Sequence, residues 1–206
     1  LQDDDTLAKL MIRRIVLQYD DTIRKNFGKQ KYQDEIKHII TYQRRNHFIR
    51  KLTLDLKGNT LVLYNYVEKH GKPLYENIKM HADEKRKIFF VSGNTATSDR
   101  EAIRMIVEKQ KNSIIVASLG TFSTGINIRN LHNIVFASPS KSQIRVLQSI
   151  GRGLRKTDDG KDTTLYDIVD DISWKSRKNY GILHADERLR IYGREKFMHK
   201  TYKVQL

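Results

Sequence analysis

Six short apolar runs, rich in β-branched and aromatic residues, recur along the chain and constrain its fold more than any other feature. They are Ile15–Tyr19, Leu61–Tyr64, Ile88–Val91, Ile114–Ala117, Ile134–Ala137 and Leu165–Val169. Their apolarity is continuous rather than alternating, which is typical of strands buried on both faces of a parallel sheet. Helical patterns over 34–57 and 99–110 lie between runs. We therefore expect an α/β fold with a mostly parallel central sheet and helices on both faces.

The charge balance points to a polyanionic partner. The 206 residues include 39 Lys and Arg against 24 Asp and Glu, a formal charge of +15. Residues 24–51 hold nine basic and two acidic side chains (+7), and 172–206 hold nine and three (+6). Either stretch alone fits a solvated helix face equally well, whereas their sum favours nucleic acid. We expect 172–206, which includes Trp174, to form a basic helical extension packed on the domain.

Composition also excludes several classes of protein. No apolar run approaches the ~20 residues that span a bilayer, so we expect no membrane partner. The acidic start, Leu1–Asp5, does not resemble a signal or transit peptide. Cysteine is absent, which excludes disulfides, thiol nucleophiles and Cys-based zinc sites and fits a reducing compartment. Seven scattered histidines include no H-E-x-x-H pair, so no metal site is expected.

A glycine-containing loop follows the run Ile114–Ala117. Gly120 and Gly125 have the G-x-x-x-x-G spacing of a phosphate loop. A Walker A motif then requires Lys and Ser or Thr, but Ile126 and Asn127 follow, so this chain alone should not bind Mg·ATP in the usual manner. The loop is either an ordinary strand-to-loop turn or a set of backbone N–H groups that can bind phosphate.

A basic segment, which we call the arginine element, contains Gly151-Arg152-Gly153 and Arg155. Arg152 and Arg155 are three residues apart, so on a helical turn they can point the same way. Two converging guanidinium groups suit a phosphoryl group, whose charge is spread over several oxygens. The alternative is a basic helix C-terminus, where glycine ends the helix and arginine complements its dipole.

Two adjacent carboxylates, Asp170 and Asp171, follow the last apolar run. They are compatible with a catalytic pair or a metal ligand. A strand-end turn, or a salt bridge with Lys175 or Arg177, is the more ordinary interpretation and the one we expect.

Five landmarks within about a hundred residues resemble the second RecA-like domain of superfamily 2 helicases. They are Leu61–Asn65, Val91–Gly93, Asp99–Glu101, Ser118–Ile128 and Gln148-x-x-Gly151-Arg152-x-x-Arg155. Lys69-His70-Gly71-Lys72, Gly120–Gly125 and Leu147–Lys156 are in addition similar to recombination helicases of T-even phages. This closer resemblance extends from about Tyr19 to the end of the chain.

The resemblance implies an ATP-dependent DNA helicase that acts on branched recombination, replication and repair DNA, in the infected cell's cytoplasm if phage-encoded. Such enzymes bind ATP with Mg²⁺ between two RecA-like domains, and the N-terminal one carries the Walker A lysine and the DExH-type motif. Neither is present here, and the first residue is Leu1, so we expect the second half of such a protein. Residues 1–20 would be a linker and first strand from the preceding domain, 21–171 the RecA-like helicase C-terminal domain, and 172–206 the extension.

The resemblance also implies roles for individual residues. Arg152 and Arg155 would be arginine fingers at the triphosphate, with Gln148 orienting nearby groups. Gly125 and Asn127 would approach the nucleotide sugar, where the family often has Asp in place of Asn127. The nucleic-acid backbone would be held by Asn65, Ser92, Gly93, Ser118 and Thr121. Two alternatives stay open: a basic nucleic-acid-binding module of RecA-like shape without catalysis, and a nucleotide-binding α/β enzyme of another kind.

Overall fold

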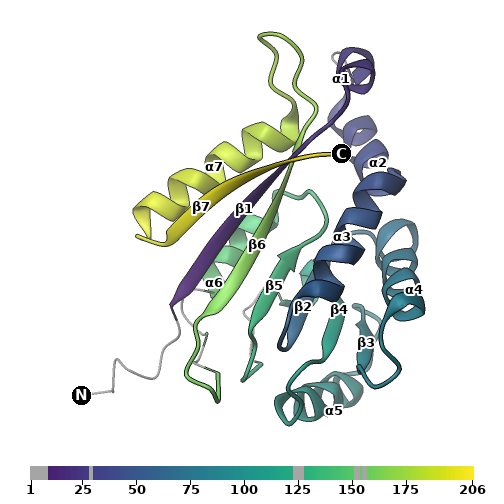
Figure 1. Cartoon of the computed structure of the whole chain (residues 1–206), viewed down its shortest axis with the longest axis vertical. Coiled ribbons are helices and arrows are strands. Elements are labelled where there is room, and N and C mark those ends of the chain that lie inside the picture. Colours follow the sequence, from purple (N-terminus) through teal and green to yellow (C-terminus); the bar gives the residue numbers. More distant parts are fainter. Residues whose placement is uncertain (1–8, 28–29, 123–127, 151–153, 155–156) are drawn as a thin grey trace.

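A computed structural model of the chain describes residues 9–27, 30–122, 128–150, 154 and 157–206 (Figure 1). The described residues form one seven-stranded sheet in which every pairing is parallel, with the order β3-β4-β2-β5-β6-β1-β7. The strands are β1 (Leu10–Gln18), β2 (Thr60–Tyr64), β3 (Ile88–Val91), β4 (Ile114–Ser118), β5 (Asn133–Phe136), β6 (Thr163–Asp171) and β7 (Met198–Gln205). Each of the six apolar runs lies largely within one of β1 to β6, so the expected parallel sheet is confirmed.

The helices alternate with these strands. They are α1 (Asp21–Phe27), α2 (Tyr32–Thr41), α3 (Gln43–Asp55), the π-helix η2 (Val67–Gly71), α4 (Lys72–His81), α5 (Thr97–Glu108), the 3₁₀-helix η3 (Leu119–Phe122), α6 (Gln143–Ile150) and α7 (Tyr180–Arg194). The helical pattern over 34–57 is divided between α2 and α3, because Tyr42 adopts an extended conformation with φ −72° and ψ 111°. None of these described helices is both long and apolar enough to cross a bilayer.

Two helical layers cover the two faces of the sheet (Figure 1). On one face, α2, α3 and α4 pack on the strands through a core that includes Ile39, Ile49, Ile78, Val62 and Val116. On the other, α5, α6 and α7 contribute to a second core, which includes Val107, Leu147, Tyr192, Leu61 and Phe136. Since both faces are covered, the central strands are almost fully buried, which explains their unbroken apolarity.

The C-terminal extension contains a helix and a strand. The expectation of a helix is confirmed for α7, but it is wrong for Met198–Gln205, which form β7 and pair in parallel with β1. The side chains of β7 are mostly exposed because it lies at an edge of the sheet and has few apolar neighbours. A polar edge strand of this kind does not produce the continuous apolar run that marks the buried strands.

The first strand lies inside the sheet. β1 pairs with β6 along its whole length, from Leu10 opposite Thr163 to Gln18 opposite Asp171, and its other edge pairs with β7. The segment that we expected to enter from a preceding domain thus contributes a strand to this sheet, and it holds the C-terminal strand in place.

Candidate functional site

The expected backbone-binding residues lie at one edge of the sheet, where three neighbouring strands end. Tyr64 of β2 lies opposite Ser118 of β4, so Asn65 follows at that level. Val91 of β3 lies opposite Ala117 of β4, so Ser92 and Gly93 follow at the same edge. Because parallel strands end together, the structure brings these groups onto one surface, the carboxyl edge of the sheet.

The hydroxyl groups at this edge shape their own loops. Ser118 Oγ and Thr121 Oγ1, from β4 and η3, are hydrogen-bonded at 2.6 Å. Since a hydroxyl pair uses only one of its two hydrogens for the mutual bond, one O–H can still donate outward. In the neighbouring loop the Ser92 N–H donates to Thr95 Oγ1 at 2.9 Å, and open space surrounds the Gly93 α-carbon. The edge therefore offers donors and close backbone approach, which suit phosphate oxygens.

A small cavity of ≈ 220 Å³ lies beside this edge, between α5 and the loop after β4. Thr121 lines it together with Arg100 and Arg104 of α5. Arg100 donates from Nη2 to Thr97 Oγ1 at 3.3 Å, while its Nε is buried and has no partner among the described residues. Arg100 belongs to the landmark Asp99–Glu101, but the sequence did not indicate a separate role for its guanidinium group.

A buried hydrogen-bond chain supports the edge from behind. The Asn65 backbone N–H donates to Ser138 Oγ at 3.0 Å, and Ser138 Oγ lies 2.6 Å from His70 Nδ1. His70 Nε2 lies 3.1 Å from Asn46 Oδ1, and Asn46 Nδ2 donates to the Ile40 carbonyl at 2.8 Å. An amide oxygen only accepts, so His70 carries its proton on Nε2, and Ser138 donates to His70 Nδ1.

His70 is neutral within this hydrogen-bond chain. Burial, followed by the nearby Arg45 guanidinium, lowers the pKa of His70 to about 3. The neighbouring Gly71 is packed closely, since a Cβ there would stand 2.5 Å from the Tyr64 ring. The network joins α3 to the end of β2 with one fixed direction of donation. Sequence reasoning missed it, although the Lys69–Lys72 run had marked the segment.

Helix α6 begins beside the same serine. Gln143 Nε2 donates to the Ser138 carbonyl, and its Oε1 is buried without a partner in the described part of the chain. Gln148 lies in the last turn of α6, where its side chain is exposed and makes no hydrogen bond to a described residue. The structure thus leaves Gln148 free to contact a separate group, and does not join it to the edge residues.

Four expected nucleotide-binding residues fall outside the part of the chain that the structure describes: Gly125, Asn127, Arg152 and Arg155. Their roles stay predictions. Among the described residues, no group of three or more His, Asp and Glu side chains is arranged to hold a metal ion.

The carboxylates at the end of β6 have structural partners. Asp171 accepts from the Ser173 N–H at 3.0 Å, which is the expected strand-end turn. Asp170 binds Arg45 through two hydrogen bonds, of 2.7 and 3.1 Å, and both side chains are buried. The expected salt bridge from Lys175 or Arg177 is therefore wrong for Asp170, because α3 supplies the cation from the face of the sheet.

Comparison with known proteins identifies the family. The model of the helicase conserved C-terminal domain matches residues 43–157, more than half of the chain. This chain therefore belongs to the helicase C-terminal domain family, and the resemblance inferred from its motifs is confirmed.

Individual relatives sharpen this assignment. The chain is 36% identical over 219 residues to the ATP-dependent DNA helicase uvsW of Enterobacteria phage T4, which covers 100% of this chain and 43% of that protein. The crystal structure of T4 UvsW superposes with a TM-score of 0.81 and 34% identity, covering 95% of this chain and 42% of that one. The putative ATP-dependent helicase IRC3 of Saccharomyces cerevisiae is 33% identical over 110 residues, 47% of this chain and 16% of that protein. The chain thus spans less than half the length of these relatives.

Proposed function

We propose that this chain is the C-terminal motor domain of an ATP-dependent DNA helicase that unwinds or migrates branched DNA in recombination, replication and repair. The observation that carries the proposal is the similarity to the phage enzyme along the whole of this chain. The partner within the protein would be an N-terminal RecA-like domain holding most of the contacts to ATP and Mg²⁺. When bound, ATP supplies the phosphoryl transfer that drives movement.

The carboxyl edge would hold the DNA backbone. Asn65 and Ser92 follow β2 and β3, Ser118 is the last residue of the adjacent parallel strand β4, and Gly93 and Thr121 extend the same surface. Hydroxyl, amide and backbone N–H groups bind phosphate oxygens without reading bases, which suits a motor that moves along any sequence. The hydrogen-bond chain through His70 would keep Asn65 and the start of α6 in register as the domains close.

The nucleotide side would be served by the arginine element. Arg152 and Arg155 would reach the triphosphate and stabilise charge in the transition state, with Gln148 orienting neighbouring groups. Gly125 and Asn127 would lie against the nucleotide sugar. A finger of this kind is worth ~10³–10⁵ in rate in well-studied phosphoryl-transfer systems.

The test is to replace Arg152 or Arg155 by Ala in a protein that joins this chain to its N-terminal RecA-like domain. We expect DNA-stimulated ATP hydrolysis to fall by roughly 10³-fold or more, with DNA affinity little changed. Arg194→Ala is the matched control, since the Arg194 side chain is 63% exposed and its one ion pair among the described residues is with Glu195 at 3.5 Å. Turnover retained in both finger variants would reject this role.

The alternative is a basic nucleic-acid-binding module of RecA-like shape without catalysis, which the charge of +15 favours. It predicts DNA binding by the chain but no dependence of ATP hydrolysis on either arginine. The same two variants therefore separate the hypotheses.

A further inference from the structure

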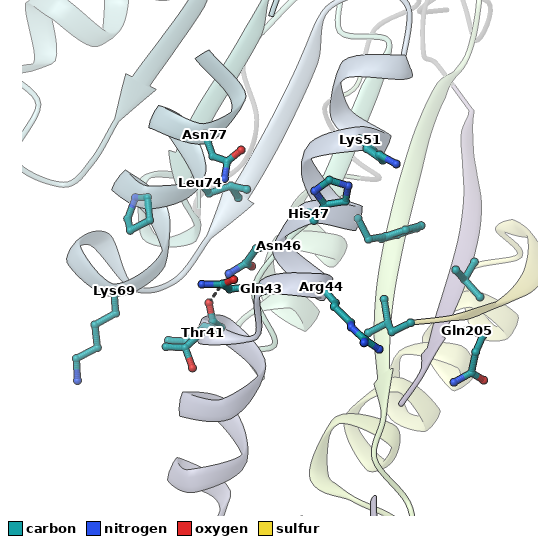
Figure 2. A pocket seen from close by; sticks show the side chains of 15 residues that line it. Thr41, Gln43, Arg44, Asn46, His47, Lys51, Lys69, Leu74, Asn77 and Gln205 are labelled. Atoms are coloured by element: carbon teal, nitrogen blue, oxygen red, sulfur yellow. Dashed lines mark hydrogen bonds between the residues drawn. The ribbon is translucent and has the colours of Figure 1, made fainter. Parts of the chain in front are cut away.

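A groove of ≈ 890 Å³ opens beside the helices α2, α3 and α4 (Figure 2). It lies between the end of α2, the first half of α3, the start of α4 and the end of β7. We call it the basic groove, because its lining includes Arg44, His47, Lys51 and Lys69. Its volume is that of pockets that hold drug-sized molecules, which is space enough for a nucleotide unit.

The lining of the groove is positively charged. None of the described residues that line it is Asp or Glu. Lys51 and Lys69 are exposed, and neither makes an ion pair or hydrogen bond with a described residue. Arg44 forms an ion pair with Asp20 at 3.3 Å, but both side chains are at least half exposed, so breaking this pair costs only about 0–1 kcal/mol.

A second cationic group adjoins the groove on the same two helices. Arg50 of α3 contacts His47 Nδ1 at 2.7 Å and His81 Nε2 at 3.1 Å, and donates to Asn77 Oδ1 at 3.0 Å. These partners are uncharged acceptors, so the guanidinium charge is not cancelled. Desolvation lowers the pKa of His47, and the charges of Arg50 and Lys51 add smaller contributions in the same direction.

The floor is apolar. Phe48, Leu74 and Pro73 line it, and in Figure 2 the labelled Leu74 lies between the cationic side chains of α3 and Lys69. The cations are spread along the groove: Arg44 and Lys51 lie toward the end of β7, and Lys69 beyond the start of α4. A row of cations over an apolar floor matches a linear polyanion with flat bases better than a single phosphate ion.

The groove is joined to the carboxyl edge by hydrogen bonds. Asn46 lines the groove, and its Oδ1 accepts from His70 Nε2, which begins the chain that ends at the Asn65 N–H. The same buried network therefore positions one residue of the groove and one residue of the carboxyl edge.

We propose that the basic groove binds a single-stranded segment of nucleic acid, with Arg44, Lys51 and Lys69 on phosphates and a base against Phe48. This site extends the proposed function, on which it rests, by giving the strand a second contact outside the carboxyl edge. An acidic protein segment is the competing occupant, and the test below excludes it or accepts it.

The test compares two triple variants of this chain. Arg44→Ala/Lys51→Ala/Lys69→Ala removes the rim of the groove, and Lys85→Ala/Lys87→Ala/Lys111→Ala removes three exposed lysines near the opposite, amino edge. Each lowers the formal charge from +15 to +12. Binding of fluorescent oligo(dT) is measured against NaCl concentration. We expect the slope of log K against log salt to fall in magnitude by about 2 in the groove variant, at ~0.7 for each lost contact, and far less in the control.

Further measurements keep the outcome decisive. Phe48→Leu, which preserves an apolar side chain, should weaken oligo(dT) binding roughly five-fold through lost stacking. Equal losses in the two triple variants would overturn the proposal, as would loss of poly-glutamate binding with oligo(dT) binding intact, which would assign the groove to an acidic protein.

The groove and the motor function fail separately. In the two-domain protein the groove variant should keep its maximal ATP hydrolysis and need more DNA to reach it. The Arg152→Ala and Arg155→Ala variants should lose ATP hydrolysis while their DNA requirement stays unchanged. A normal DNA requirement in the groove variant overturns the groove alone, while active arginine variants overturn only the finger role.

Discussion

Two aspartates of β6, three residues apart, each hold a buried arginine and a tyrosine, but on opposite faces of the sheet. Asp170 binds Arg45 of α3 at 2.7 Å and accepts from the Tyr19 hydroxyl at 2.9 Å. Asp167 binds Arg188 of α7 at 2.8 Å and accepts from the Tyr192 hydroxyl. The strand β6 thus binds one helix of each layer through the same three residue types, Asp, Arg and Tyr.

The two clusters differ in how much of the chain they join. Asp167 and Arg188 are 21 residues apart, within one strand-to-helix unit. Asp170 and Arg45 are 125 residues apart, so their pair closes the fold between its first helices and its later strands. Arg45 Nη1 is also buried without a partner among the described residues, whereas no nitrogen of Arg188 is both buried and unpartnered among them. The long-range pair is therefore the less completely satisfied.

The clusters also have different neighbours. Arg45 stands between Arg44 and Asn46, both in the basic groove, and its charge helps to lower the pKa of His70. Arg188 lies on α7, on the face away from the groove. Damage to the two clusters should thus cost similar stability but affect function differently.

The largest expected effect comes from removing one partner of a buried pair. Asp170→Asn and Asp167→Asn each leave a guanidinium buried without its counter-charge, and each should lower the free energy of unfolding by about 3–5 kcal/mol. Urea denaturation measures this loss. Under conditions where both variants remain folded, Asp170→Asn should weaken oligo(dT) binding more, because α3 carries the groove.

Replacing both charged groups is the control. Arg45→Met/Asp170→Leu removes the unpaired charge, so it should recover much of the stability that Asp170→Asn loses. Equal oligo(dT) affinities in the two Asn variants would show that the two clusters do not differ in their effect on binding and that both serve only to stabilise the fold.

A smaller effect concerns pH, through the network that adjoins the Asp170 cluster. The pKa of His70 is about 3 in the fold and ~6.5 when unfolded, so the unfolded state binds the extra proton as pH falls below ~6.5. Stability should then fall with pH in this window. Between pH 7.5 and 5 the loss from His70 is about 2 kcal/mol, from ~1.4 kcal/mol per pH unit.

His70→Gln isolates this contribution. A glutamine can keep a donor toward Asn46 and an acceptor toward Ser138, but it does not titrate. Urea unfolding at pH 7.5 and at pH 5 should show that the free energy of unfolding falls by about 2 kcal/mol less in the variant than in the wild-type protein. The contributions of His38 and His184 should be the same in both proteins and therefore cancel. Parallel pH profiles would mean that His70 is not held neutral by this network.

These two clusters show where sequence reasoning reaches its limit. Each of β1 to β6 could be predicted because burial on both faces leaves an apolar run, and Asn65, Ser92 and Ser118 could be placed because each follows such a run. Arg45 could not be distinguished from Arg44, its exposed neighbour, since the difference is which face of α3 meets β6. Local sequence does not encode a contact 125 residues away.

The groove was out of reach for the same reason. The basic stretch 24–51 was evident, but its charges do not act alike, because Arg45 is buried while Arg44 and Lys51 are exposed. Lys69 of η2 is brought near them by the packing of η2 against α2 and of α4 against α3. The strand β7 was missed because, at a polar edge, pairing with β1 decides its structure more than the apolarity of its own residues.

The smallest expected effect is at an exposed pair beside the Asp167 cluster. Lys178 Nζ lies 2.8 Å from Asp186 of α7, with exposures of 59% and 36%. The Coulomb attraction is screened by water, and ordering two flexible side chains costs entropy, so Lys178→Ala should cost only ~0.2–1 kcal/mol.

This cost should shrink further in 1 M NaCl, where the screening length is ~3 Å, whereas the loss in Asp167→Asn should persist because that pair is shielded from salt. Urea unfolding of both variants at low and high salt measures the contrast. A salt-sensitive loss in Asp167→Asn would show that water reaches the Arg188 pair, and would remove the distinction between buried and exposed charges on which the comparison of the two clusters depends.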